Sequence, residues 1–200
     1  MPWLLAYLAA AAGAAPAPSF ACDRPATYAE RSICADPRLA AYDRAMARLY
    51  RRSAPGAIAA QRRWLAERDR CHDPDCLLER HEERLLELAG DSAFPAPTLR
   101  SATDRNASLA VAPLGGGWFM FYATDLWIYP GGGNANTAES AGVFRLEPTG
   151  GEYRSADGCA IRFERLSGGR WRLTERSGDD SIPCGGLNTG YTGLYGPAPK

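Results

Sequence analysis

Six cysteines constrain the fold of this 200-residue chain more than any other feature. Four lie in the front half and two in the back half: Cys22, Cys34, Cys71, Cys76, Cys159 and Cys184. An even set of cysteines in an exported chain is most simply explained by disulfides, here three. Because each half holds an even number, each half can close its own bridges. The sequence therefore predicts two internally cross-linked parts.

Export is indicated by the first residues of the chain. Trp3 to Leu8 is an apolar run followed by alanines, as in a signal peptide, and the small residues up to Ala14 fit cleavage at that point. The run is shorter than the roughly 20 apolar residues that span a bilayer. Cys22 ends a lipoprotein-like segment, but Ser19 stands where a lipoprotein signal usually has Leu. We therefore expect a signal peptide over residues 1–14, a soluble periplasmic or secreted bacterial protein, and no stable membrane insertion after cleavage.

The overall charge restricts the class of partner. Basic and acidic side chains cancel, at 23 each, which argues against nucleic acid or an anionic membrane held by bulk electrostatics. The apolar fraction of 46% is that of an ordinary globular protein. Any binding is therefore expected to depend on a local arrangement of side chains.

Residues 22 to about 90 are predicted to be helical. Thr27 and Glu30 form a capping-box pattern, and Asp36 and Asp73 each combine an N-cap carboxylate with a proline at the first helical position. Apolar residues then recur at helical spacing. Helices are expected over residues 27–34, 37–53, 57–71 and 74–90. Since none can bury its apolar stripe alone, they are predicted to pack as a small antiparallel bundle.

The expected bundle bears on how the four front cysteines pair. A tight turn between the second and third helices places the start of one beside the end of the other, which brings Cys34 towards Cys71 and leaves Cys22 for Cys76. The other two pairings stay open at this level. A metal site around Cys71 and Cys76 is the competing hypothesis, but their spacing is not the C-x-x-C of structural zinc sites. We predict no metal and no cofactor.

The ordered motifs of residues 20–90 match a known pattern. They are Phe20-x-Cys22, Glu30-x-x-Ile33-Cys34-Ala35-Asp36, Leu39-x-x-Tyr42-Asp43, Tyr50, Gln61-x-x-Trp64-Leu65-x-x-Arg68-Asp69-x-Cys71 and Cys76. This run resembles the LprI-like N-terminal domain family, named after a lipoprotein reported to inhibit lysozyme. The resemblance implies an exported helical domain and singles out as motif residues Asp36, Asp43, Tyr50, Gln61, Trp64, Arg68 and Asp69. His81 stands where family members more often have Tyr.

The same residues have structural roles available without the family. Trp64 and Tyr50 fall on apolar stripes and are expected in the core. Gln61, Arg68 and Asp69 can tie the helices together through side-chain hydrogen bonds. His81 lies in a leucine register, so we expect a packed, hydrogen-bonded histidine rather than a catalytic one.

The back half has the pattern of a β protein. Prolines and glycines mark residues 91–116 as a linker. Strands are expected over residues 118–124, 126–129, 143–147, 159–166 and 170–175, with glycine turns between them. Cys159 and Cys184 would join a strand to the C-terminal segment. The predicted fold class is α+β, a disulfide-linked antiparallel helical bundle over residues 20–90 followed by a small antiparallel β-barrel or sandwich over residues 117–200.

The side chains that catalysis needs are scarce in this chain. His72 neighbours a predicted disulfide, His81 lies on a helix stripe, all six cysteines are committed, and no carboxylate pair is marked by its surroundings. We therefore predict a binding protein and not an enzyme.

Two functions are compatible with that conclusion. The resemblance implies an inhibitor of lysozyme or a related muramidase, which would present arginine to a cleft that contains two carboxylates; the candidates are Arg62, Arg63, Arg68 and Arg70. The alternative is a non-inhibitory periplasmic module that binds another envelope protein or a glycan. For that role the candidate recognition segments are the aromatic pair Trp127 and Tyr129 and the loops 131–136 and 178–180.

Overall fold

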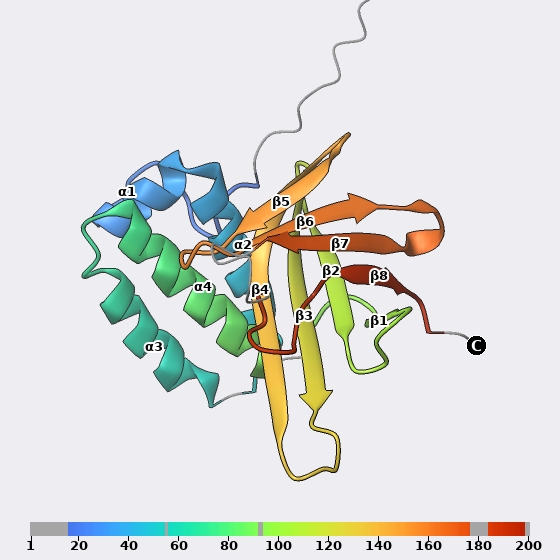
Figure 1. Ribbon diagram of the computed structural model, residues 1–200. Coiled ribbons are helices and arrows are strands. Elements are labelled where there is room, and N and C mark those ends of the chain that lie inside the picture. Colours follow the sequence, from blue (N-terminus) through green and yellow to red (C-terminus); the bar gives the residue numbers. More distant parts are fainter. Residues whose placement is uncertain (1–15, 55, 92–93, 177–183, 199–200) are drawn as a thin grey trace, which may run out of the picture.

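The computed structural model describes residues 16–54, 56–91, 94–176 and 184–198. Within them, four α-helices precede eight strands that close into an antiparallel barrel (Figure 1). The predicted signal peptide and the acidic loop 178–180 lie outside the described residues.

The helices are α1 (Tyr28–Ala35), α2 (Pro37–Tyr50), α3 (Ala57–Arg68) and α4 (Pro74–Asp91). Their predicted starts are confirmed. Thr27 and Glu30 form the reciprocal capping box of α1, and the Asp36 carboxylate accepts hydrogen bonds from the first turn of α2. The Asp73 carboxylate accepts from the Cys76 N–H at 2.8 Å at the start of α4. These caps satisfy backbone N–H groups that a helix leaves unpaired, which is why local sequence determines where each helix begins.

Each strand of the barrel pairs with its neighbour in sequence, and β8 returns to β1. The strands are β1 (Leu99–Ser101), β2 (Ser108–Gly115), β3 (Trp118–Ile128), β4 (Ala135–Glu147), β5 (Gly150–Arg154), β6 (Ala160–Arg165), β7 (Trp171–Arg176) and β8 (Gly193–Gly196), with a 3₁₀ turn at Ser167–Gly169. Aromatic rings fill the interior, where Phe144 and Phe163 stack with centroids 4.0 Å apart. A Cβ at Gly142 would lie 2.4 Å from the Tyr153 ring, so only glycine fits there. The inside of the barrel is therefore a packed core.

The predicted division into a helical bundle followed by a separate β unit is wrong. One core cluster contains α2 and α4 residues together with residues of β2, β3 and β4, among them Met46, Leu85, Met120 and Val143. Figure 1 shows the helices grouped against one side of the barrel. The physical reason is that β3 and β4 carry apolar residues on both faces: the inner face fills the barrel, and the outer face is covered by α2 and α4.

Residues 91–116 also differ from the prediction, because this expected linker contains β1 and β2. Pro113 reads as a strand breaker in the sequence. In the structure the register of β2 against β3 shifts between Pro113 and Gly115. A β-bulge is a place where a strand tolerates proline, since the missing N–H does not interrupt a regular ladder.

The prediction of three disulfides is confirmed, but the pairing expected in the front half is wrong. The bonds are Cys22–Cys34, Cys71–Cys76 and Cys159–Cys184. Cys71 does lie near the end of α1, in a cluster with Ile33 and Leu39. However, Cys71 lies in the short turn between α3 and α4, Cys76 lies in the first turn of α4, and Cys22 folds back on α1. Each cysteine therefore pairs with a partner that the chain already brings close. Because Cys71 and Cys76 are bonded to each other, neither offers a thiolate to a metal.

Candidate functional site

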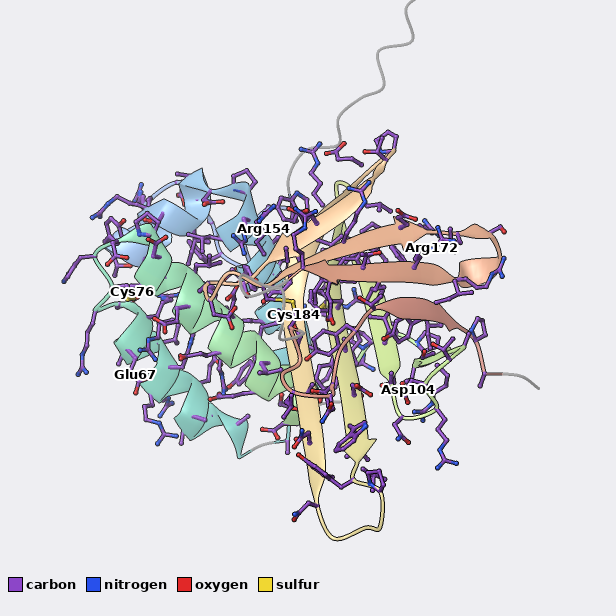
Figure 2. The ribbon with its side chains drawn as sticks, viewed as in Figure 1. Glu67, Cys76, Asp104, Arg154, Arg172 and Cys184 are labelled. Carbon is purple, nitrogen blue, oxygen red and sulfur yellow. A yellow bond between two sulfur atoms is a disulfide. The ribbon has the colours of Figure 1, made fainter. Side chains whose placement is uncertain are left out.

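A groove of about 640 Å³ lies between α4 and the barrel. One wall is the exposed side of α4, from Asp75 to Leu86. The opposite wall combines β4, Tyr153 of β5, the turn after β5, and Tyr191. Cys76 and Cys184 belong to opposite walls, and Figure 2 labels both. Since each of these cysteines is held in a disulfide, both walls are braced by a covalent bond.

The charge of the groove is of one sign. Among the described residues that line it, six are acidic and none is Arg, Lys or His; the acids are Asp75, Glu79, Glu82, Glu83, Glu139 and Asp157. Carboxylates on low-dielectric walls focus a negative potential into the space between them. The groove is thus suited to a positively charged group.

Three of these acids repeat every fourth residue along α4. Asp75, Glu79 and Glu83 therefore share one face of the helix. Like charges at this spacing destabilise a helix by about 0.2–0.5 kcal/mol per pair. Arg80 pairs with Glu83 at 2.7 Å, whereas no side chain among the described residues pairs with Asp75 or Glu79. The helix dipole favours Asp75, which lies in the first turn, but no cation in the described part of the chain pairs with Glu79 to offset the repulsion that it receives from its two neighbours in the row. An uncompensated charge at Glu79 favours a role in binding.

The Glu82 side chain lies where the helices meet the barrel. Its Oε1 accepts a hydrogen bond from the Tyr42 hydroxyl at 3.0 Å and pairs with Arg38 at 3.2 Å. Its Oε2 accepts from the Ala156 N–H, in the turn after β5, at 2.9 Å. Burial raises the pKa of Glu82, while the hydrogen bonds from Ala156 and Tyr42 and the charge of Arg38 act in the opposite direction. Glu82 thus joins α4 to α2 and to the barrel.

The barrel wall has a polar network of its own. The Tyr122 hydroxyl is hydrogen-bonded to Glu139, and burial together with the charge of Glu139 raises the pKa of Tyr122 to about 12. Asp157 accepts from the Ser155 hydroxyl within the turn after β5. These bonds orient the two barrel carboxylates that face α4.

The motif residues of α3 lie away from the groove and connect α3 to α4. The Gln61 Oε1 accepts two hydrogen bonds from the Arg84 guanidinium, both at 3.1 Å. The Trp64 Nε1 donates to the Arg80 carbonyl at 2.9 Å. The Arg68 guanidinium lies over the Trp64 ring and pairs with Asp69 at 2.6 Å. Without these contacts α3 would have little to hold it, since its buried side chains are Trp64 and Arg68.

The other motif residues have structural positions as well. Asp36 caps α2, Tyr50 packs against the core cluster shared with the barrel, and the buried Asp43 accepts a hydrogen bond from the Ser19 N–H. His81 is fully buried, and its Nδ1 bonds the Leu77 carbonyl at 2.6 Å. Its Nε2 has no hydrogen-bond partner among the described residues. The expectation of a packed histidine is confirmed, but only one of its nitrogens is hydrogen-bonded.

The structure excludes one of the four arginines that were candidates for entering the cleft of lysozyme. Arg68 is 6% exposed and committed to Asp69, so it cannot enter a partner's cleft. Arg62, Arg63 and Arg70 are exposed.

Sequence reasoning missed the groove itself. The one available signal was the row of acids on α4, because a helix predicted over residues 74–90 already places Asp75, Glu79 and Glu83 on one face. The opposite wall comes from strands far along the chain, and the sequence contains no sign that Glu139 or Asp157 faces α4.

A comparison with protein-family models, curated proteins and solved structures found no match to this chain. None of the helices among the described residues is long and apolar enough to cross a bilayer. Among those residues no group of three His, Cys, Asp or Glu side chains is placed to hold a metal ion.

Proposed function

We propose that this chain is an exported binding protein whose acidic groove takes a cationic segment of a partner protein. The observation that carries the proposal is the groove between α4 and the barrel, where six carboxylates converge. Glu82 and Glu83 are paired with arginines, and the other four have no ion-pair partner among the described residues. Its volume of about 640 Å³ is within the range of sites that enclose a ligand. The proposed activity is recognition, with no catalytic step.

Export is part of the proposal and is supported by the three disulfides. Such bonds persist in the periplasm and outside the cell and are rare in reducing compartments. The apolar run at the N-terminus is consistent with this assignment. The place of action is then the bacterial cell envelope or its surroundings, and the resemblance to the LprI-like family points the same way.

The groove predicts binding of an arginine-rich peptide. Titrating the protein with a capped tetra-arginine peptide in a calorimeter should show saturable binding that weakens as salt is added. Substituting both Glu79→Gln and Glu83→Gln should weaken it about tenfold, since two partly exposed charge pairs contribute about 1–2 kcal/mol together. The same substitutions remove like-charge repulsion from α4 and also the exposed Arg80–Glu83 pair. These two small effects have opposite signs, so the melting temperature should stay nearly unchanged.

A matched control makes the same change of charge elsewhere. Glu147 and Glu164 are carboxylates on the barrel that do not line the groove. Changing both to Gln should leave binding of the tetra-arginine peptide nearly unchanged. Equal weakening by the two double variants would mean that the peptide responds to net charge, and the groove would lose its assigned role.

Lysozyme inhibition is a second candidate, and the outer face of α3 favours it. Ile58 is 49% exposed and Leu65 is 37% exposed, with the exposed Arg62 between them on the same face. Figure 1 shows α3 at the edge of the helical layer, away from the barrel. An arginine flanked by apolar side chains on a protruding helix is suited to a cleft that contains two carboxylates.

This second candidate predicts that a molar excess of the purified protein slows the clearing of a turbid cell-wall suspension by lysozyme. Arg62→Ala should restore most of the clearing rate. Arg172→Ala should not, because Arg172 is an exposed arginine on the barrel (Figure 2). Undiminished clearing in the presence of excess wild-type protein would rule out this function and leave the groove proposal standing.

A further inference from the structure

The β3–β4 hairpin extends beyond the rest of the barrel (Figure 1). The pairing of these strands continues without interruption from Trp118 opposite Arg145 to Ile128 opposite Ala135. The extended end, residues 126–138, contains no charged side chain. Most of these residues are exposed. A surface stretch of this length without charge is unusual, since charged residues are normally interspersed.

One face of this extension carries two aromatic rings. Side chains alternate along a strand, so Trp127 and Tyr129 lie on the same face, and their ring centroids are 4.2 Å apart in an edge-to-face arrangement. Tyr129 is 37% exposed and Trp127 is half-buried. Ile128, between them, lies on the opposite face and is 52% exposed.

Amide groups accompany the rings. Asn136 is paired directly with Trp127 across the hairpin, and this places both side chains on one face. The Asn136 Nδ2 donates to the Leu187 carbonyl at 2.6 Å, which fixes the amide beside the Trp127 ring. Leu187 itself is 63% exposed. We call the set Trp127, Tyr129, Asn136 and Leu187 the hairpin platform.

The platform is held from two sides. The Asn106 side chain donates to the Leu126 carbonyl at 2.9 Å at the base of the extension, and the segment that carries Leu187 is tied to Asn136 and, through the Gly190 N–H, to Asp125 at 3.0 Å. The turn residues Gly131, Gly132 and Gly133 all have positive φ and lie beyond the platform. Trp127 is therefore on a paired strand, and Tyr129 follows the end of β3, where its N–H donates to the Asn134 carbonyl at 3.1 Å. This pairing presents the two rings in a fixed arrangement.

We propose that the hairpin platform binds a neutral oligosaccharide. Sugar rings offer apolar C–H faces to aromatic side chains and hydroxyl groups to amides, and this platform supplies both without any charge. A cationic or anionic ligand would find no counter-charge on residues 126–138. The inference goes beyond the groove proposal, since the platform continues the inner face of β3 and the groove faces α4.

The test is a calorimetric or NMR titration of the intact chain with chitotetraose and, separately, with cellotetraose. Saturable binding of at least one, with Kd on the order of 1 mM or tighter, is expected. Trp127→Ala should weaken it at least about tenfold, because a ring face is lost. Ile128→Ala is the matched control: it removes an exposed apolar side chain from the same hairpin but from the opposite face, and binding should be retained.

Three outcomes would overturn the inference. The first is no binding of either sugar at concentrations well above the millimolar range. The second is equal weakening by Trp127→Ala and Ile128→Ala, since that would reflect a general change in the hairpin. The third is binding to neutral phosphatidylcholine vesicles but not to sugars, which would make the aromatic pair a membrane contact. The melting temperatures of both variants should match that of the wild type, so that a loss of binding is not a loss of folding.

Discussion

Replacing Met120 by alanine is expected to destabilise the helices and the barrel together. Met120 is fully buried on the outer face of β3, in the core cluster that α2 and α4 share with the barrel. Truncation of a buried methionine to alanine costs about 2–5 kcal/mol, because apolar contacts are lost and a cavity remains. For a chain of this size the melting temperature should fall by about 5–15 °C.

Two spectroscopic signals separate a shared core from two independent units. Far-ultraviolet circular dichroism reports mainly the helices. The near-ultraviolet signal reports packed aromatic rings, most of which lie in the barrel. The unfolding midpoints followed by the two signals should shift by the same amount in Met120→Ala. Ile58 is 49% exposed on α3. Ile58→Ala should therefore change the free energy of unfolding, followed by either signal, by no more than about 0.5 kcal/mol. If the helical transition kept its wild-type midpoint while the barrel transition moved, the two parts would unfold independently.

Local features of the fold could be predicted from the sequence. Thr27, Asp36 and Asp73 mark helix starts because each cap is completed by a backbone N–H within the next few residues. The strands β6 and β7 alternate apolar and polar side chains and are joined by a glycine turn, so they were also recognisable. In these cases the interacting partner lies nearby in the chain.

The shared core and the barrel closure could not be predicted in the same way. Met120 faces helices, and Phe121, the next residue, faces the barrel interior, so both faces of β3 are apolar and alternation does not say what covers each. The closure depends on β1, only 3 residues long, which pairs Arg100 with Gly196 near the other end of the barrel sequence. Such short, distant pairings leave almost no pattern in a single sequence.

The residues of the candidate site also differ in how far the sequence could predict their positions. Glu79 and Glu83 lie on a helix whose register the sequence determines, so their shared face was predictable in principle. Glu139 and Asp157 reach the groove only because the outer face of the barrel packs on α2 and α4. The groove is therefore a product of the shared core, which the prediction of two separate units excluded. A variant that loosens this core should also weaken the proposed binding of a cationic peptide in the groove.

Lowering the pH from 7 to 4.5 is expected to destabilise the protein through His81. This ring is fully buried between α2, α3 and α4: it meets the rings of Tyr42 and Trp64, and Arg68 and Asp43 are the charged groups nearest to it. Burial lowers the pKa of His81 from 6.5 to about 4, and the charge of Arg68 acts in the same direction. The hydrogen bond to the Leu77 carbonyl and the charge of Asp43 oppose that shift without cancelling it.

The direction of the effect follows from which state binds the proton. Above pH 6.5 the histidine is neutral in both the folded and the unfolded chain, and it contributes no pH dependence. Between pH 6.5 and about 4 the unfolded chain takes up a proton that the folded chain excludes, so the free energy of unfolding falls. The full loss is about 3 kcal/mol, and it levels off below pH 4 because both states are then protonated.

Urea unfolding of the wild type and of His81→Leu at several pH values between 7 and 4.5 tests this expectation. Leucine cannot titrate, so the variant should lose less stability than the wild type over that window. The raised pKa of Glu82 and the lowered pKa of Glu30 affect both proteins alike and cancel in the comparison. His72→Gln is the matched control, since it removes an exposed histidine and keeps the buried one. This variant should lose more stability than His81→Leu over the same window. Parallel curves for the wild type and His81→Leu would show that the buried ring does not determine the response to acid.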